Sequence, residues 1–132
     1  MLEPRLNLIV LRVADIDRSA SFYSQLGLAF QKHSHGTGPI HCSAELAGIV
    51  FELYPASASH PVTSSVRIGF EVSDIANAIK RLLAFEGCRL ISRVAESEWG
   101  LRAVIADLDG HRVELTQAVL PHSSDPSGKI DT

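Results

Sequence analysis

The chain has 132 residues, 45% of them hydrophobic, so it can bury about two-thirds of its unfolded surface in one core without disulfides or metals. The formal net charge of −3 and the scattering of Lys and Arg provide no basic stripe, which argues against a nucleic-acid partner. The isolated Cys42 and Cys88, the lack of a charged leader before an apolar stretch and the strand-length apolar runs predict a cytoplasmic protein without a membrane partner.

Apolar residues alternate along residues 8–13, which predicts a strand with one packed face and one face that carries Leu8 and Arg12. Asp15 directly precedes a helical spacing of apolar residues, where its carboxylate is placed to accept hydrogen bonds from free N–H groups of the first turn. Gly27 then suits a left-handed exit from the helix. A strand followed by a capped helix is therefore expected at the start of the chain.

Three further strands are expected after this helix, over residues 29–35, 40–46 and 49–54. The Gly-Thr-Gly-Pro segment 36–39 separates the first two strands, and the tight Ala47-Gly48 pair separates the last two.

A symmetric turn at Ala47-Gly48 would place Ser43 opposite Glu52 and His41 opposite Tyr54. Residues that oppose one another across a hairpin share a face of the sheet. The expected result is a polar face directed away from the apolar residues of the same strands.

The second half of the chain repeats the first. Residues 66–75 align without gaps on residues 7–16. They are followed by a helical pattern that ends at Gly87 and by a strand that carries Glu114, which corresponds to Glu52 in the first half. The aligned segments share the pairs Ile9/Ile68, Val13/Val72, Asp15/Asp74 and Ile16/Ile75. The later strands of this half are expected over residues 89–94, 101–106 and 112–118.

The repeat predicts an α+β fold of two βαβββ modules in tandem, within a single domain over residues 1–120. Module one spans 5–55, a Ser-, Ala- and Pro-rich linker spans 56–65, and module two spans 66–120. A polar tail over residues 121–132 is expected to be frayed.

Seven short motifs, spread over nearly the whole chain, resemble those of a known family. They are Leu11–Ile16, Ser21–Tyr23, Leu26–Leu28, Phe51–Leu53, Phe70–Ile75, Asp107–Gly110 and Glu114–Leu115. The set resembles the vicinal oxygen chelate superfamily, which includes glyoxalases, bleomycin resistance proteins and extradiol dioxygenases. The resemblance implies a cup-shaped mixed sheet around a cleft, often with one divalent metal that binds substrate oxygens and stabilises an enolate-like intermediate. It also implies a homodimer.

The metal-ligand positions of that family correspond in this chain to Leu8, Glu52, Arg67 and Glu114. Leucine has no electron pair to donate, and arginine stays protonated and repels a cation. We therefore expect no cofactor at the usual four-ligand site. A divalent metal remains possible through a rearranged set of His41, Glu52 and Glu114.

Charge complementarity offers a different interpretation of the same positions. The Arg67 guanidinium can occupy the space of the missing cation and neutralise both Glu52 and Glu114. In an enzyme, a lyase or isomerase, either glutamate would move the proton and Arg67 would act as the electrophile. The remaining candidate contacts to a substrate are His41, Tyr54, Trp99, Leu8, Arg12, His33 and His35.

Several alternatives remain open at the level of sequence. His33 and His35 form either a basic hairpin that closes over a ligand or a solvated one, and His41 is either a general base or a structural histidine. Trp99 either caps the cleft or anchors its loop. Two functions are therefore expected to compete: a protein that binds a small oxygenated molecule, and a metal-dependent lyase, like lactoylglutathione lyase, or a dioxygenase.

Overall fold

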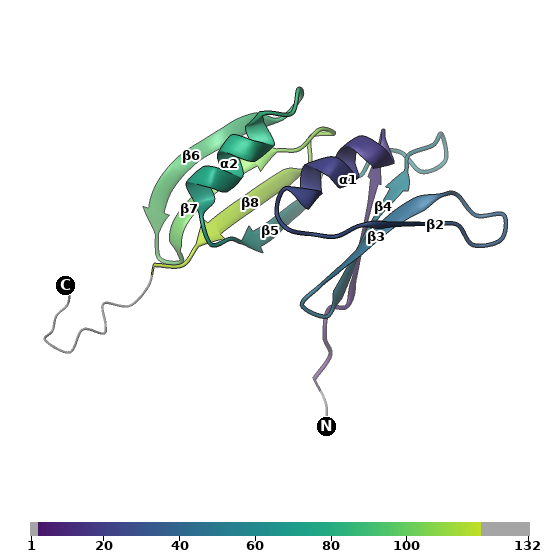
Figure 1. Cartoon of the computed structure of the whole chain (residues 1–132), viewed down its shortest axis with the longest axis horizontal. Helices are drawn as coiled ribbons and strands as arrows, with labels where there is room; N and C mark the ends of the chain where they lie inside the picture. The colour runs from purple at the N-terminus through teal and green to yellow at the C-terminus, as the bar shows by residue number, and fades with distance from the viewer. Residues whose placement is uncertain (1–2, 120–132) are drawn as a thin grey trace, which may run out of the picture.

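The computed structural model describes residues 3–119 and confirms two βαβββ modules in tandem (Figure 1). The predicted tail over residues 121–132 lies outside the described residues. In chain order the elements are β1 (Leu8–Val13), α1 (Ile16–Ser24), β2 (Gln31–His33), β3 (His41–Leu46), β4 (Ile49–Pro55), β5 (Arg67–Glu71), α2 (Ile75–Leu83), β6 (Arg89–Ser97), β7 (Gly100–Ala106) and β8 (Arg112–Gln117).

Each module is a four-stranded mixed sheet, in the order β1-β4-β3-β2 and β5-β8-β7-β6. The first strand of each module runs parallel to the last, and the remaining pairs are antiparallel. The β3–β4 register places Ser43 opposite Glu52, as the symmetric turn predicts. Ala47 and Gly48 both have positive φ angles, 51° and 82°, which is the turn geometry that fits the twist of a hairpin.

Both helices begin where the sequence indicates. The Asp15 carboxylate accepts hydrogen bonds from the N–H groups of Asp17 and Arg18, and the Asp74 carboxylate accepts from that of Asn77. After the helices, Gly27 and Gly87 each adopt a φ of 101°, which a residue with a Cβ rarely tolerates.

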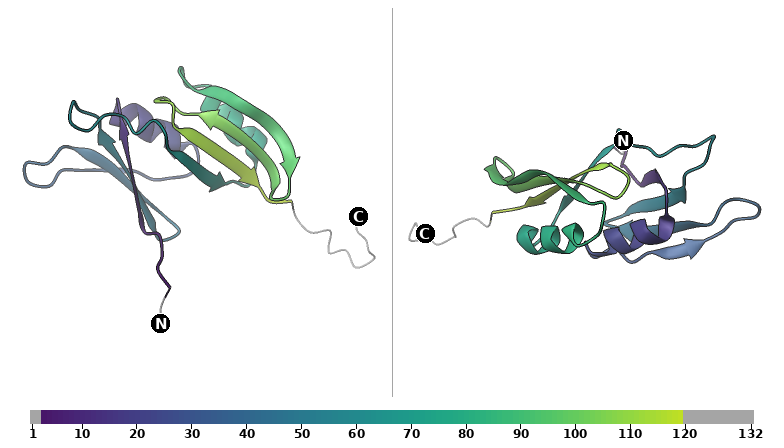
Figure 2. Two further views of the ribbon diagram at one scale, coloured as in Figure 1. Left: turned by 180° about the vertical axis from the view of Figure 1, so that it is seen from behind. Right: turned by 90° about the horizontal axis from the view of Figure 1, so that it is seen from above.

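The helices lie side by side and cover one face of each sheet (Figures 1 and 2). The core lies between these helices and the apolar faces of the strands, and the opposite faces of the sheets carry no helix. Neither helix among residues 3–119 is long and apolar enough to cross a membrane. The largest fully buried side chains include Tyr23, Phe22, Leu11, Leu53, Ile75, Leu82, Ile105 and Leu115.

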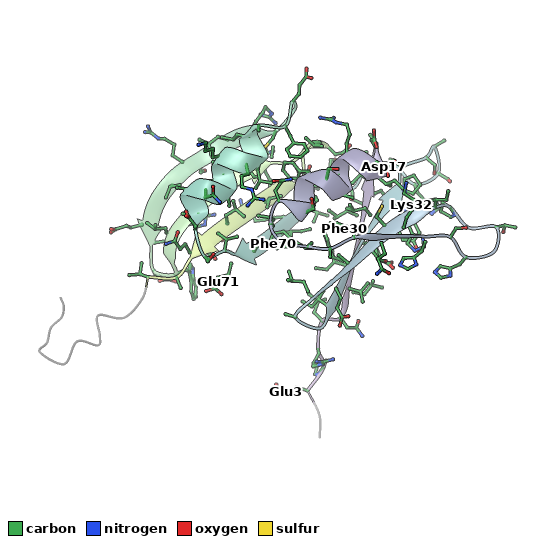
Figure 3. The ribbon with its side chains drawn as sticks, viewed as in Figure 1. Glu3, Asp17, Phe30, Lys32, Phe70 and Glu71 are labelled. Carbon is green, nitrogen blue, oxygen red and sulfur yellow. The ribbon has the colours of Figure 1, made fainter. Side chains whose placement is uncertain are left out.

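Aromatic side chains join the two modules. Tyr23 packs edge-on against Phe51, whose ring centroid lies 6.0 Å from that of Phe70 and 6.2 Å from that of Phe30. Phe30 and Phe70 are labelled in Figure 3. Phe22 belongs to the same joint through a second edge-on contact. Such edge-to-face contacts add stability beyond the burial of their area.

Two strands differ in length from the prediction. β2 ends at His33, before the expected residue 35, because the chain already turns toward the Gly-Pro segment. β6 extends to Ser97, beyond the expected residue 94, and its pairing with β7 contains register shifts that interrupt the alternation of the sequence.

Candidate functional site

The open face of the first sheet carries a stack of three side chains from adjacent strands. The Tyr54 ring of β4 lies parallel to the His41 ring of β3, with centroids 4.3 Å apart and an interplanar angle of 6°. The Arg12 guanidinium of β1 lies 4.8 Å from the centroid of the Tyr54 ring. The predicted face therefore brings these three residues together.

Glu52 lies beside this stack, in the centre of the same face. The Ser43 hydroxyl donates a hydrogen bond of 2.7 Å to Glu52 Oε2. His41 Nε2 lies 3.9 Å from the same oxygen, too far for a hydrogen bond. The side chain of Glu52 is only 19% exposed, so its carboxylate is largely shielded by the sheet.

The two remaining histidines of the prediction approach His41 from the β2 side. His33 pairs with His41 across β2 and β3, and the rings of both His33 and His35 lie within 6 Å of the His41 ring, at 5.8 Å and 5.4 Å. Leu8 is on the same sheet at its outer edge, where it is 50% exposed. It offers an apolar wall and no donor atom.

The open face of the second sheet is organised around Glu114. Arg102 Nη2 donates to Glu114 Oε1 at 3.0 Å, and Arg67 Nη1 approaches the same oxygen at 3.5 Å. The hydrogen bond from Arg102 is the main reason that the pKa of Glu114 lies below its usual value. Arg102 was not among the residues predicted from the sequence, although it lies opposite Thr116 in the β7–β8 register and so shares the face of Glu114.

Trp99 occupies the turn between β6 and β7 and is 66% exposed, so it is not anchored in an apolar gap. Together with Glu71, Glu114 and Thr116 it lines an open hollow of about 340 Å³. A large exposed aromatic side chain at the rim of a polar hollow is available for contact with a ligand.

The single chain does not bring Glu52 and Glu114 together. They lie in separate hydrogen-bonded sheets, and within residues 3–119 no hydrogen bond or ion pair joins either Glu52 or His41 to Glu114 or Arg67. The physical reason is the aromatic joint, which packs the modules through the apolar faces that carry Tyr23, Phe51 and Phe70. The expected neutralisation of both glutamates by Arg67 and the metal set of His41, Glu52 and Glu114 are therefore not assembled within one chain.

A buried polar network that was not predicted from the sequence lies at the joint. Asp107 accepts hydrogen bonds from the Tyr23 hydroxyl and from His111 Nδ1, the latter at 2.9 Å. The other ring nitrogen of His111, Nε2, lies 2.8 Å from the Thr63 hydroxyl. Burial alone would raise the pKa of Asp107, but the hydrogen bonds from His111 and Tyr23 outweigh it and lower the pKa. The network ties α1, the linker and the β7–β8 turn together.

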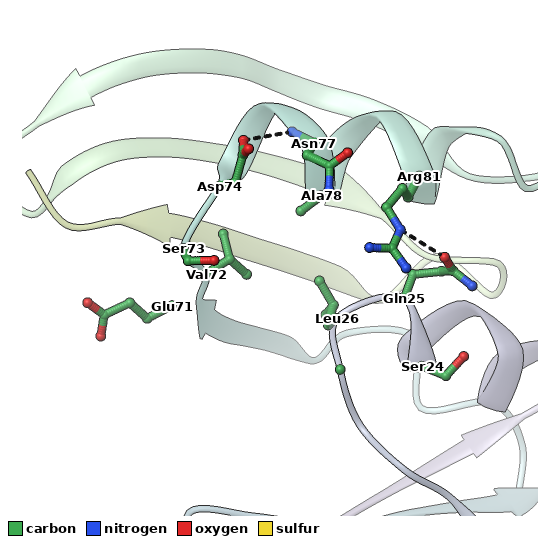
Figure 4. Close-up of a pocket in the computed structure, with 11 residues that line it drawn as sticks. Ser24, Gln25, Leu26, Glu71, Val72, Ser73, Asp74, Asn77, Ala78 and Arg81 are labelled. Atoms are coloured by element: carbon green, nitrogen blue, oxygen red, sulfur yellow. Dashed lines mark hydrogen bonds between the residues drawn. The ribbon is translucent and has the colours of Figure 1, made fainter.

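A further polar hollow of about 330 Å³ lies between the end of α1 and the beginning of α2 (Figure 4). Arg81 Nε donates to Gln25 Oε1 across it at 3.1 Å, and Glu71 and Asp74 contribute carboxylates. None of the residues predicted as a site lines this hollow.

Comparison with known proteins places these features in a family. The family model described as the Glyoxalase/Bleomycin resistance protein/Dioxygenase superfamily matches residues 5–115. No curated protein sequence matches the chain significantly.

Several solved structures share the fold. A glyoxalase/bleomycin resistance protein/dioxygenase family enzyme from Burkholderia phytofirmans PsJN has 18% identity and a TM-score of 0.67, covering 88% of this chain and 100% of that chain. TnmS3, an antibiotic binding protein from Streptomyces sp. CB03234, has 20% identity and a TM-score of 0.66, with coverages of 90% and 99%. A glyoxalase-related enzyme from Fulvimarina pelagi has 23% identity and a TM-score of 0.65, with coverages of 97% and 97%.

Proposed function

Because the chain belongs to the glyoxalase/bleomycin resistance protein/dioxygenase superfamily, we propose that it binds a small oxygenated molecule on its polar sheet faces, without the four-ligand metal site of the family. The observation that carries this proposal is the state of Glu114, whose Oε1 atom is in contact with the guanidinium groups of both Arg102 and Arg67. A carboxylate that is already neutralised by two cations is a poor ligand for a third.

The residues at the four family positions do not fit a divalent ion. Leu8 has no donor atom, and the Arg67 guanidinium stands where a ligand would be needed. Of the two glutamates at these positions, only Glu52 has a carboxylate with no cationic side chain within hydrogen-bond distance among residues 3–119. A single carboxylate does not hold a divalent ion.

The side chains on the two faces indicate the chemistry of the ligand. On the first face, the flat stack of Tyr54 and His41 provides a wall for a planar group. On the second face, Arg67, Arg102 and Arg112 outnumber the central Glu114, which favours a carboxylate or phosphate on the ligand. TnmS3, which shares the fold, is described as an antibiotic binding protein. A planar, oxygen-rich molecule with an anionic group is the expected class.

A second copy of the chain completes the cleft in this proposal. β1 and β5 are edge strands, and the open face beside β1 exposes Leu8 and Val10. A row of unpaired backbone groups flanked by apolar side chains favours pairing with another strand. Pairing of the first sheet of one copy with the second sheet of the other would bring Glu52 and Glu114 to one groove. Sedimentation velocity should then give twice the chain mass of 14.3 kDa, and Val10→Lys should shift the protein to monomer.

Ligand binding can be followed through Trp99, the only tryptophan of the chain. We expect a planar, carboxylate-bearing antibiotic to change Trp99 fluorescence, with one binding event per cleft. Arg102→Gln should weaken binding of the same compound by at least about tenfold, because it removes a charge-assisted contact. Arg93→Gln is the matched control, since Arg93 is an exposed arginine on β6, which β7 separates from the strand of Glu114. Equal affinity of the Arg102→Gln variant and the parent would refute the role of this face.

The alternative, a lyase that uses His41, Glu52 and Glu114, requires Glu114 to leave both arginines. Its assay is isomerisation of the hemithioacetal of methylglyoxal and glutathione in the presence of Zn²⁺ or Ni²⁺. Turnover that disappears in Glu114→Gln would favour the lyase over the binding protein. No turnover with the metals present, together with ligand binding, is the result that the proposal predicts.

A further inference from the structure

Three imidazole rings gather at the open end of the β2–β3 hairpin. His33 and His41 are cross-strand partners, and His35 follows two residues after His33. The centroids of the three rings are separated by 6.0 Å for His33 and His35, 5.8 Å for His33 and His41, and 5.4 Å for His35 and His41. No other group of side chains among residues 3–119 brings three histidines this close.

This spacing is near that of a metal site. Imidazole nitrogens bind Zn²⁺ at about 2.0–2.1 Å in tetrahedral geometry, which places ring centroids about 5 Å apart. The rings of His33 and His35 lie nearly parallel, at 10°, so they must turn for their nitrogens to converge on one ion. His35 is exposed and His33 is half-buried, which leaves both side chains room to turn.

His41 is already oriented as a ligand. It is 3% exposed, and its Nδ1 atom lies 3.2 Å from the carbonyl oxygen of Pro39. A carbonyl only accepts, so Nδ1 carries a proton, and in the neutral imidazole Nε2 then carries the lone pair. A hydrogen bond from one ring nitrogen to a backbone carbonyl is the usual way to orient the other nitrogen toward a metal. The stacked ring of Tyr54 holds the His41 ring in this plane.

The lone pair of His41 Nε2 has no hydrogen-bond partner among residues 3–119. Its nearest charged neighbour is Glu52 Oε2 at 3.9 Å. A cation between two electron-rich atoms in a shielded position stabilises both of them. One metal–nitrogen bond and one metal–oxygen bond, each of about 2.0–2.2 Å, together span such a distance. The Ser43 hydroxyl holds the Glu52 carboxylate in place from the other side.

We propose that His33, His35 and His41, with Glu52 within reach as a fourth ligand, form a binding site for a divalent transition-metal ion, Zn²⁺ or Ni²⁺. Imidazole-rich sites favour these ions over Mg²⁺ and Ca²⁺, which prefer oxygen ligands. The site lies within one chain and shares only Glu52 with the family positions, which also include Leu8, Arg67 and Glu114. It goes beyond the proposed function, because the histidines would bind the ion whether or not an organic ligand is present.

A second group of potential ligands, Asp107, Asp109 and His111, has ligand atoms within 4.8 Å of one another. Both oxygens of Asp107 are already engaged by hydrogen bonds from His111 and Tyr23, and Asp109 accepts from the N–H of Ala14. An ion there would have to displace these donors. The histidine cluster is therefore the stronger candidate, and the experiment separates the two.

The test is titration of the full chain, without a polyhistidine tag, with Zn²⁺ and with Co²⁺, whose visible absorption reports coordination by nitrogen. Isothermal calorimetry should give one Zn²⁺ per chain. His33→Asn and His35→Asn, both at accessible positions, should each weaken Zn²⁺ binding by at least about tenfold. His60→Asn is the matched control, because His60 is an exposed histidine of the linker outside the cluster.

Three results would overturn the proposal: no Zn²⁺ uptake by the parent, unchanged affinity in both cluster variants, or an affinity that falls in Asp109→Asn and stays constant in His35→Asn. The last result would place the ion at the β7–β8 turn. Because no organic ligand is used, failure of metal binding leaves the proposed small-molecule function standing. Conversely, the antibiotic titration can fail while Zn²⁺ still binds.

Discussion

The two modules share one backbone plan but carry opposite chemistry on their open faces. In the first module, Glu52 accepts a hydrogen bond from the Ser43 hydroxyl and lies beside the stacked rings of His41 and Tyr54. In the second, Glu114 is held by two guanidinium groups. A duplicated fold thus fixes where the central carboxylate stands, and the residues of the neighbouring strands decide what it is available to bind.

The register makes the comparison residue by residue. Arg102 lies opposite Thr116, two residues beyond Glu114, and His41 stacks on Tyr54, two residues beyond Glu52. His41 and Arg102 are therefore equivalent positions, and each directs its basic group toward the central glutamate. Two further pairs of equivalent positions differ: Leu8 and Val50 of the first module correspond to Arg67 and Arg112 of the second.

The last hairpins of the modules differ as well. The first uses the two-residue turn Ala47-Gly48, which only reverses the chain. The second uses residues 107–111, which also reach across the joint and bind Tyr23 of α1. Equivalent turns therefore have unequal roles, because only the second connects the modules.

The largest expected effect on stability follows from this second turn, because it connects the modules. Asp107→Ala removes the acceptor of the Tyr23 hydroxyl, the His111 ring and two backbone N–H groups, all at a position that is 2% exposed. Loss of one partner from such a buried set costs roughly 3–5 kcal/mol. Urea unfolding followed by circular dichroism measures the change.

The control for this loss is Asp17→Ala. Asp17 pairs with Lys32 at 2.8 Å on the surface of module one (Figure 3). Exposed ion pairs contribute little, so the free energy of unfolding should change far less than in Asp107→Ala. Similar losses in both variants would contradict the special role of the second turn.

A second, smaller effect concerns acid stability. Since the pKa of Asp107 is lowered in the folded protein, its contribution is complete above the unfolded pKa of about 3.9 and is lost as the pH falls through the folded value. From about pH 5 to about pH 2, the parent should therefore lose more free energy of unfolding than Asp107→Asn, which has no charge to lose. Parallel curves of stability against pH would show that Asp107 titrates as in an unfolded chain.

Most of the fold could be predicted from the sequence, because its signals are local. Asp15 and Asp74 mark helix starts through groups only two or three residues away, and the Ala47-Gly48 turn fixes the register of Ser43 against Glu52. The length of β6 was missed because its irregular pairing breaks the alternation on which strand prediction rests.

The candidate site was only partly predictable, because it depends on contacts between distant segments. Alternation correctly grouped His41, Glu52 and Tyr54, which lie on adjacent strands. It contained no information on how the two sheets are placed, so whether Glu114 joins them within one chain or between two copies could not be predicted. The Asp107 network was missed for the same reason, since Thr63 and His111 meet only after the linker folds back on the joint.

In the turn of the first module, a substitution is expected to raise the free energy of unfolding by a smaller amount. Ala47 has a φ of 51°, a conformation that alanine adopts at a cost and asparagine tolerates. Ala47→Asn creates the Asn-Gly pair favoured in two-residue hairpins and should raise the free energy of unfolding by about 0.5 kcal/mol. Gly48→Ala, at a φ of 82°, should lower it. Destabilisation by Ala47→Asn would mean that the turn is not left-handed.

The smallest expected effect is on the pKa of Glu114, and it distinguishes the two arginines of the second face. Arg102 lies closer to Glu114 Oε1 than Arg67 does, 3.0 Å against 3.5 Å, and Arg67 is 59% exposed. In Arg102→Gln the pKa of Glu114 should therefore rise toward its usual value, and in Arg67→Gln it should rise less. Carbon-detected NMR titration of the Glu114 carboxyl measures both shifts. A larger rise in Arg67→Gln would make Arg67 the main partner of Glu114, and His41 would then have no functional counterpart in the second module.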